Sequence, residues 1–280
     1  MIKFRHALVL GTICMLLGQS GHAQTIFSDS FESGTKMAQG MLTWQGTAGG
    51  VSISTDWAST GKYSMKFPYV AKPEDDDDFV EQRFSIGTGT EDLWIRFKLK
   101  VPTGYYHRNV PGSDNNKFFK ISSNRDSDSA QGVNLMWEYW PTSDGGSRLA
   151  YHWTNPDVEI GEHKALTYVF GPKEAGQVLE FVLRARMSSK SGVKDGIVQT
   201  WVRSSDSAAF KQIHNETAAP MYPSSRWPTQ TKWVAGYILG WANSSFGANT
   251  TFYIDDLRMS SSSLLDDVVA PKPPGGISVQ

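Results

Sequence analysis

The stretch "DLWIRFKLKV", residues 92–101, decides the class of fold that this sequence specifies. Apolar side chains at Leu93, Ile95 and Phe97 alternate with other residues, which is the period of a β-strand with one buried face. Short runs of this kind recur along the chain, and Gly, Asn, Asp, Ser and Pro cluster between them. About a dozen such strands without helical periodicity predict an all-β protein, an antiparallel β-sandwich of the jelly-roll type.

The two ends of the chain differ from this pattern. Residues 1–23 combine a basic start, an apolar run too short to span a bilayer, and small residues at Gly21 and Ala23. They predict a secretory signal peptide cleaved after Ala23, so we expect an extracellular or periplasmic protein. The only cysteine, Cys14, lies inside this segment, which leaves the remainder without disulfides. We expect one glycan-active domain over 24–262 and a Pro/Gly-rich tail or linker over 263–280.

Composition narrows the choice of partners. The formal net charge is −1, which gives no electrostatic case for nucleic acid or an anionic membrane. No later apolar segment approaches membrane length, and we expect a monomer. Ten tryptophans and ten tyrosines are many for this length, and they either fill the core or face sugar rings.

Several stretches resemble exported jelly-roll domains of the concanavalin A-like group, namely "DSFESG" at 29–34, "GKYSMKF" at 61–67, "DGIVQTWV" at 195–202 and "FYIDDLRMS" at 252–260. That group contains lectins, glycan-binding modules, glycoside hydrolases and polysaccharide lyases. The middle of the chain is most similar to lyases that cleave uronate polymers such as alginate and glucuronan, through "LWIRFKLKVPTGY" at 93–105, "NNKFFKI" at 115–121 and "NLMWEYW" at 134–140. The resemblance therefore implies a secreted polysaccharide lyase that acts on an acidic polysaccharide without a redox cofactor.

β-Elimination requires three kinds of side chain. One neutralises the uronate carboxylate, one removes the neighbouring proton, and one protonates the leaving oxygen. The resemblance places Lys117 and Tyr151 on matching positions, while Asn134 stands where such lyases carry arginine and Trp153 where they carry a second tyrosine. The catalytic candidates are Lys117, Tyr151, His107 and Asn134, and the substrate-binding candidates are Arg108, Tyr106, Arg83, Glu81, Trp153 and Glu138.

Strand alternation predicts which of these side chains share a face. The predicted sets are Lys117 with Phe119 and Ile121, Phe118 with Lys120, Tyr151 with Leu149 and Trp153, Asn134 with Met136 and Glu138, and Glu81 with Arg83. We expect Lys117 and Tyr151 to open onto one cleft, with the loop at 106–108 leaning over it. Phe118 is expected in the core between the sheets.

A structural calcium ion is a further hypothesis. The resemblance implies one calcium between the first and last strands, and the matching carboxylates are Asp29, Glu32 and Asp255. The acidic run at 75–78 is interpreted as a solvated loop, with weak calcium binding as its alternative.

Other functions stay open. The alternative to a lyase is a non-catalytic lectin-like module, in which Trp137, Trp140, Trp153 or Trp241 stacks on sugar rings. A glycoside hydrolase is less favoured, because the carboxylate spacing of Asp76, Asp78 and Glu81 begins in a run of aspartates that makes a poor strand. The tripeptide "QIH" at 212–214 follows a turn-rich stretch and is discounted as a lyase motif. A structural or adhesive surface protein is a third class.

Overall fold

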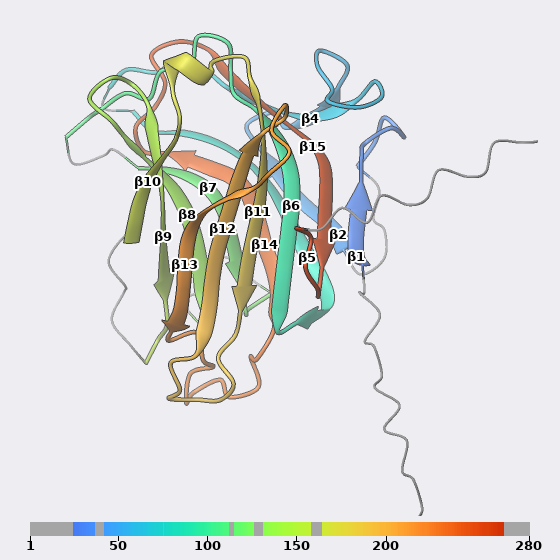
Figure 1. Cartoon of the computed structure of the whole chain (residues 1–280), viewed down its shortest axis with the longest axis vertical. Coiled ribbons are helices and arrows are strands. Elements are labelled where there is room, and N and C mark those ends of the chain that lie inside the picture. The colour runs from blue at the N-terminus through green and yellow to red at the C-terminus, as the bar shows by residue number, and fades with distance from the viewer. Residues whose placement is uncertain are drawn as a thin grey trace, which may run out of the picture.

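The structure, a computed structural model, describes residues 25–36, 42–74, 76–111, 115–125, 131–157 and 164–265. The predicted signal peptide and most of the predicted tail lie outside these residues. In the described ranges the chain forms strands and one short 3₁₀ turn, η1, at Pro172–Glu174 (Figure 1). The strands are β1 Thr25–Asp29, β2 Leu42–Ala48, β3 Ser52–Ser54, β4 Ser64–Tyr69, β5 Asp78–Thr90, β6 Asp92–Lys100, β7 Asn116–Ser122, β8 Asn134–Pro141, β9 Ser147–Thr154, β10 Lys164–Phe170, β11 Val178–Arg186, β12 Gly196–Ser204, β13 Lys211–Ala219, β14 Trp233–Ala242 and β15 Thr250–Ser260.

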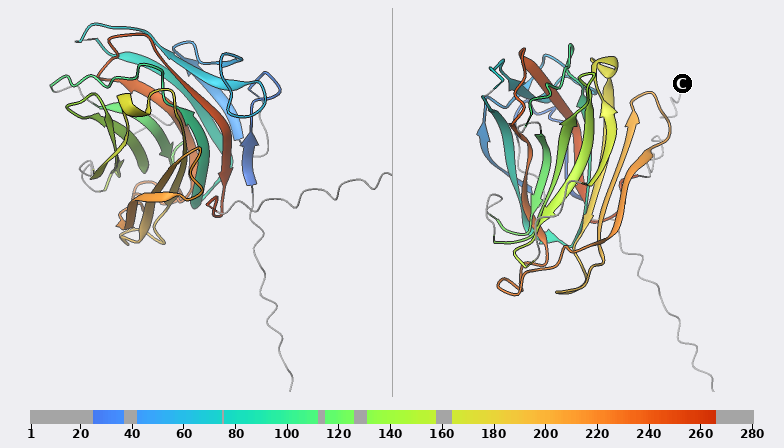
Figure 2. Two further views of the ribbon diagram at one scale, coloured as in Figure 1. Left: turned by 45° about the horizontal axis from the view of Figure 1, so that its top comes forward. Right: turned by 90° about the vertical axis from the view of Figure 1, so that its left-hand side faces the viewer.

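These strands build two antiparallel sheets that pack face to face (Figure 2). The eight-stranded sheet has the order β13-β12-β11-β6-β15-β4-β3, with β1 added to β15. The seven-stranded sheet has the order β10-β9-β8-β7-β14-β5-β2. The predicted all-β antiparallel sandwich is confirmed.

Aromatic side chains fill the space between the sheets. Phe97 of β6 stacks on Phe181 of β11 with 5.7 Å between ring centroids, and on Phe119 of β7 with 5.8 Å. Both Phe97 and Phe181 are wholly buried. Such ring pairs add attraction beyond the apolar area that they bury, and the Phe97–Phe119 pair joins the two sheets.

Strand β7 departs from simple alternation at its N-terminal end. Lys117 lies opposite Glu138 and Phe119 opposite Trp137, so β7 carries one extra residue there, a β-bulge. Phe118 and Phe119 therefore both enter the core, and each is 1% exposed or less. The predicted location of Phe118 is correct, whereas the prediction that Lys117 shares a face with Phe119 and Ile121 is wrong. After the bulge, Lys120 returns to the side of Lys117.

The inner face of β8 and β9 carries Trp137, Tyr139, Tyr151 and Trp153. Trp137 is buried, and its Nε1 donates a hydrogen bond of 3.0 Å to Thr200 Oγ1 on β12 of the other sheet. Tyr151 lies opposite Trp137, and its ring is 5.1 Å from that of His214 on β13. Tyr151 thus points between the sheets. The prediction that Lys117 and Tyr151 open onto one cleft is wrong.

A buried hydrogen-bond chain continues from Thr200 to His214. The hydroxyl of Thr200 lies 3.1 Å from His214 Nδ1, and Nε2 lies 2.8 Å from the carbonyl oxygen of Ala165. Nε2 must carry the proton, because a carbonyl oxygen only accepts. Burial lowers the pKa of His214 to about 4, so this imidazole is neutral in the folded protein at neutral pH. The histidine of "QIH" is therefore a core residue.

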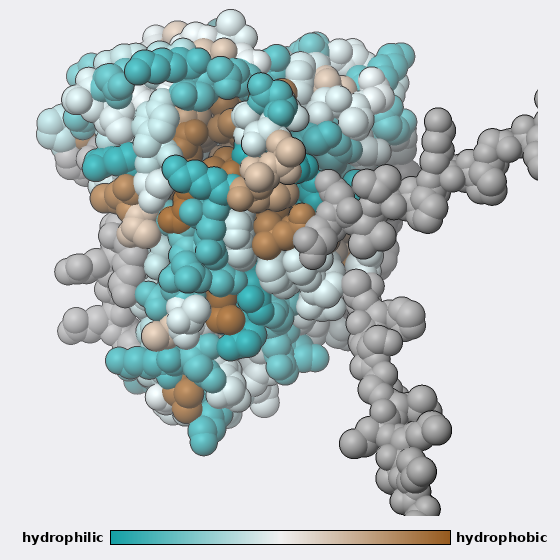
Figure 3. Space-filling model, in the orientation of Figure 1, coloured by the Kyte–Doolittle hydropathy of each residue, from teal (hydrophilic) through white to brown (hydrophobic). Residues whose placement is uncertain are grey.

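The face of the eight-stranded sheet nearest the viewer in Figure 1 is largely hydrophilic, with separate small apolar groups (Figure 3). Among the residues that the structure describes, no helix has the length and apolar character needed to cross a membrane. The charged residues of the candidate site lie on the seven-stranded sheet, on its surface that faces away from the eight-stranded sheet.

Candidate functional site

Seven polar or charged side chains gather on the outer face of the seven-stranded sheet, the face turned away from the core. They come from five strands, and we call them the outer-face cluster: Glu81 and Arg83 of β5, Lys117 and Lys120 of β7, Glu138 of β8, His152 of β9 and Tyr237 of β14. Alternation puts them there, since their neighbours Phe84, Trp137, Tyr151 and Ile238 fill the core.

A buried carboxylate lies at the centre of one half of the cluster. Glu138 is wholly buried and forms an ion pair through Oε1 with Lys117 Nζ. Its Oε2 lies 3.3 Å from His152 Nδ1. The ammonium group and the imidazole therefore flank one carboxylate. The side chain of Lys117 is 18% exposed and that of His152 is 7% exposed, so Lys117 is the most exposed of these three residues.

The other half is a row across β5, β14 and β7. Arg83 lies opposite Tyr237, which lies opposite Lys120. Lys120 Nζ sits 5.5 Å from the centroid of the Tyr237 ring, within cation–π distance. Arg83 forms an ion pair with Glu81, and its side chain is 32% exposed. The predicted shared face of Glu81 and Arg83 is confirmed.

The charges of the cluster do not cancel. It holds three cations, Arg83, Lys117 and Lys120, and two carboxylates, so the cations outnumber the carboxylates. The outer face of this sheet is therefore suited to an anionic ligand.

Irregular backbone in β14 makes room for the cluster. An extra residue between Ile238 and Ala242 forms a bulge, and Leu239 inside it has a φ of 56°. A Cβ at Gly240 would lie 3.3 Å from Glu81 Oε2 and 3.4 Å from Lys117 Cβ. Bulges and left-handed non-glycine residues occur often at functional sites, where they redirect side chains.

An aromatic pair adjoins the charged residues. Trp241 of β14 is 46% exposed, and its ring lies 5.2 Å from that of Phe79 on β5. Ala242 and Val80, the residues next to them, are buried, so both rings project from the outer face. Trp241 is the candidate stacking residue that presents a large exposed ring, whereas Trp137 and Trp153 belong to the core.

Two of the predicted catalytic residues lie away from this face. His107 is wholly buried, and its Nδ1 lies 2.8 Å from Ser147 Oγ, so it does not lean over a cleft. Tyr151 and Trp153 are 4% exposed and face the core. Burial raises the pKa of Tyr151 to about 12, which further opposes its use as a proton carrier at neutral pH.

Asn134 is on the outer face but distant from Glu138. The two residues are four positions apart on β8, which corresponds to about 13 Å along a strand. The Nδ2 group of Asn134 donates to Thr154 Oγ1 at 3.2 Å. The predicted grouping of Asn134, Met136 and Glu138 on one face is confirmed, but Asn134 and Lys117 do not meet.

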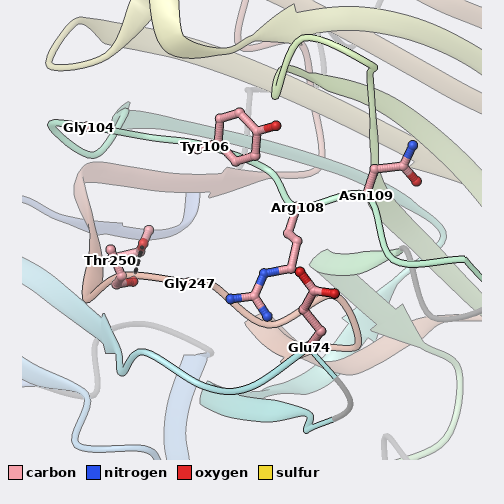
Figure 4. Close-up of a pocket in the computed structure, with 8 residues that line it drawn as sticks. Glu74, Gly104, Tyr106, Arg108, Asn109, Gly247 and Thr250 are labelled. Atoms are coloured by element: carbon pink, nitrogen blue, oxygen red, sulfur yellow. Dashed lines mark hydrogen bonds between the residues drawn. The ribbon is translucent and has the colours of Figure 1, made fainter.

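Arg108 and Tyr106 lie in loops beyond the ends of the strands. They line a hollow of about 440 Å³ together with Glu74, Asn109 and the segment at 247–250 (Figure 4). Neither belongs to the outer-face cluster. Of the substrate-binding candidates, Arg83, Glu81 and Glu138 are the ones that the structure brings together with Lys117.

Sequence reasoning missed three members of the cluster, His152, Lys120 and Tyr237. The sequence did contain a signal for His152, because strand alternation places its side chain on the face of β9 that Tyr151 does not occupy. Recognising Trp153 and Tyr151 as core residues identifies His152 as the outward side chain. Lys120 was hidden by the bulge, and no local pattern marked Tyr237.

Two of the predicted calcium ligands, Glu32 and Asp255, accept hydrogen bonds from backbone amides. Glu32 accepts hydrogen bonds of 2.9 Å from the amides of Lys62 and Tyr63, and Asp255 Oδ2 accepts one of 2.8 Å from the amide of Ser59. Burial raises the pKa of both Asp29 and Asp255. Within the described residues, no group of three or more His, Cys, Asp or Glu side chains is placed to hold a metal ion. These carboxylates do not form one ligand set here, and structural calcium stays a prediction.

The acidic run is only partly described, since residue 75 lies outside the described ranges. Strand β5 begins at Asp78, whose Oδ2 accepts a hydrogen bond of 2.9 Å from the amide of Val70. This carboxylate ties the loop before β5 to the end of β4.

Comparison with known proteins identifies the fold. No protein-family model matches the sequence, and no curated protein matches it significantly. Among solved structures, alginate lyase vAL-1 from Chlorella virus is similar with a TM-score of 0.53 and 12% identity, over 78% of this chain and 92% of that one. Alginate lyase Aly36B is similar with a TM-score of 0.49 and 9% identity, over 71% and 81%. The exoplasmic/lumenal domain of VIP36, in a Ca²⁺- and mannose-bound form, has a TM-score of 0.46 and 11% identity, over 88% and 94%.

At these identities the likeness concerns the fold alone. The chain has the jelly-roll fold that also occurs in polysaccharide lyases, as the sequence resemblance implied. What the site does must be argued from its own residues.

Proposed function

We propose that this protein binds an acidic, uronate-containing polysaccharide on the outer face of its seven-stranded sheet and cleaves it by β-elimination. The observation that carries the proposal is the contact chain from Lys117 through Glu138 to His152, which sets an ammonium group and an imidazole beside one buried carboxylate. The jelly-roll fold shared with an alginate lyase supports it. We further propose an exported monomer that uses no redox cofactor.

The first task of the site is to neutralise the substrate carboxylate. Removing the proton next to a carboxylate develops a second negative charge beside the first, so positive donors aimed at that point lower the barrier. In this proposal Lys117 binds the carboxylate and Arg83 adds a second positive charge. Both side chains are partly exposed while their counter-ions are buried, so in this proposal the substrate carboxylate approaches them from the solvent side.

The second task is proton transfer. His152 removes the proton from carbon 5 of the uronate, the electron pair forms the carbon 4–carbon 5 double bond, and the bond to the oxygen on carbon 4 breaks. Glu138 Oε2 lies 3.3 Å from His152 Nδ1, and in this proposal a proton held on Nδ1 beside that carboxylate leaves Nε2 as the basic nitrogen, while the carboxylate stabilises the imidazolium that forms. Lys120, held over Tyr237, supplies a proton to the leaving oxygen.

Hydrolysis by two carboxylates fits the face less well. Glycoside hydrolases place two carboxyl groups about 5–9.5 Å apart around the scissile bond. Glu81 and Glu138 lie on β5 and β8 with β14 and β7 between them, so their backbones are about 14 Å apart at the usual strand spacing, and the carboxyl groups reach that range only if both side chains lean toward each other. Each carboxylate is also paired with a cation.

A second candidate is a glycan-binding module without catalysis. It is favoured by one observation, the contrast between the 46% exposed ring of Trp241 and the small exposure of His152. An exposed ring beside cations binds a sugar acid by stacking and charge, with no need for proton transfer.

An absorbance screen across alginate, glucuronan, pectate and a heparin-like polymer tests the proposal. Elimination creates an unsaturated uronate that absorbs ultraviolet light, and we expect the absorbance to rise with one of these polymers. Binding without any rise in absorbance assigns the protein to the second candidate. Failure to bind any of the four contradicts both.

A further inference from the structure

The hollow that contains Arg108 and Tyr106 has the dimensions of a ligand pocket. Its volume is about 440 Å³, within the roughly 300–1,000 Å³ that small-molecule sites occupy. Three loops contribute to it: the one before β5 with Glu74, the one before β7 with Tyr106 and Arg108, and the one between β14 and β15 with Gly247 (Figure 4).

Two glycines accommodate the principal side chains of the hollow. A Cβ at Gly247 would lie 2.6 Å from Arg108 Nη2, and the φ of Gly247 lies outside the left-handed region, so glycine is needed here for space. A Cβ at Gly145 would lie 2.3 Å from the Tyr106 ring, so that ring lies against bare backbone. Its other side is open, since Tyr106 is 57% exposed. The loops thus fix a guanidinium and an accessible aromatic face.

Arg108 is held in place but retains donors. Its Nη2 donates to the carbonyl oxygen of Lys72 at 3.0 Å and its Nη1 to Ser245 Oγ at 3.4 Å. A guanidinium has five N–H groups, so most remain for a ligand. In Figure 4 the carboxylate of Glu74 points into the same space. A planar guanidinium beside an aromatic ring suits one sugar acid. The carboxylate of the sugar pairs with Arg108, the sugar ring stacks on Tyr106, and a sugar hydroxyl donates to Glu74.

The hollow is joined to the end of the sheet where Lys117 lies. Asn116, the first residue of β7, accepts a hydrogen bond of 3.0 Å from the amide of Ser244 through Oδ1. Ser244 Oγ in turn donates to the carbonyl oxygen of Arg108. Trp241 and Phe79 flank the same end, at the close of β14 and the start of β5. A polymer that extends from the outer-face cluster past Trp241 would reach the loops that line the hollow.

We propose that this hollow is a second subsite for the acidic polysaccharide, which binds one uronate residue of the chain outside the outer-face cluster. The inference rests on the proposed function of that cluster and extends it. The protein then favours long chains over short ones, because only a long chain occupies both places at once.

Calorimetric binding to alginate and to polyglucuronate, each as a size series from disaccharide to intact polymer, tests this subsite. All proteins carry His152→Ala, so that cleavage during the titration is strongly reduced. We expect Arg108→Ala and Tyr106→Ala each to weaken polymer binding by about tenfold, and to leave the shortest bound oligosaccharide unaffected. Gly247→Ala, which displaces the guanidinium without removing it, acts in the same direction.

The matched controls are Arg226→Ala and Tyr168→Ala, which remove an exposed arginine and an exposed tyrosine elsewhere, and they leave binding unchanged. The subsite is refuted if polymer binding depends on Trp241 but is unaffected by Arg108→Ala and Tyr106→Ala. It is also refuted if all chain lengths weaken equally. If the parent binds neither polymer at any length, the proposed function itself fails, and the subsite fails with it.

Discussion

Replacing Lys117 by methionine leaves the carboxylate of Glu138 buried without its ammonium partner. Glu138 is wholly buried, whereas the Lys117 side chain is 18% exposed. An isolated exposed lysine contributes little to stability, but breaking a buried ion pair from one side costs about 3–5 kcal/mol. The partial exposure of Lys117 places the expected loss near the lower limit, about 3 kcal/mol. For a chain of this size that corresponds to a fall in melting temperature of about 6–12 °C.

Urea denaturation of four proteins measures this loss: the parent, Lys117→Met, Glu138→Gln and the double variant. In the double variant the buried charge is gone, so we expect it to recover much of the loss, with a coupling of about 1–3 kcal/mol between the two sites. A Lys117 variant as stable as the parent, or losses that simply add, would refute the central position of Glu138 in the cluster.

Three further predictions concern other parts of the molecule. Trp241→Ala is expected to weaken binding to alginate or polyglucuronate by about tenfold while melting stays within about 1 °C, and an unchanged Kd contradicts the stacking role. Burial lowers the pKa of His214 to about 4 from its ordinary 6.5. As the pH falls below 6.5, His214 is therefore protonated in the unfolded chain but stays neutral in the folded protein, which favours unfolding. The protein therefore loses up to about 3 kcal/mol between pH 6.5 and 4 through this group, and a His214→Gln variant whose stability has the same pH dependence rules that origin out. If calcium joins Asp29, Glu32 and Asp255, chelation lowers the melting temperature and added calcium restores it, whereas a melting temperature that chelator leaves unmoved ends the calcium hypothesis.

The sequence was sufficient for the sandwich because its signal is repeated in every strand. Residues 92–101 show the alternation most clearly, and Leu93, Ile95 and Phe97 are buried as predicted. The sets of residues that share a face of β8 and of β9 were also predicted correctly, since the pairing of these two strands contains no bulge.

The site was predicted less well, and the reasons are physical. A bulge in β7 places Phe118 and Phe119 on one side, which alternation alone forbids. A second bulge, in β14, sets Gly240 beside Lys117 through a contact distant in sequence. Alternation also states which residues share a face without stating which face meets the core, so Tyr151 was chosen where His152 points outward. Which face of β8 and β9 meets the core depends on contacts with the other sheet, such as those of Trp137 with Thr200 and of Tyr151 with His214.

The most direct test of the central claim is the rate at which the His152→Ala variant forms unsaturated uronate from the polymer that the parent cleaves best. Glu138 and Lys117 still pair in this variant, so binding and melting are expected to stay close to those of the parent. Loss of a general base lowers the rate by about 10²–10⁴-fold, and that is the predicted result. A variant that retains the parent rate, with equal binding, contradicts the assignment of proton removal to the outer-face cluster.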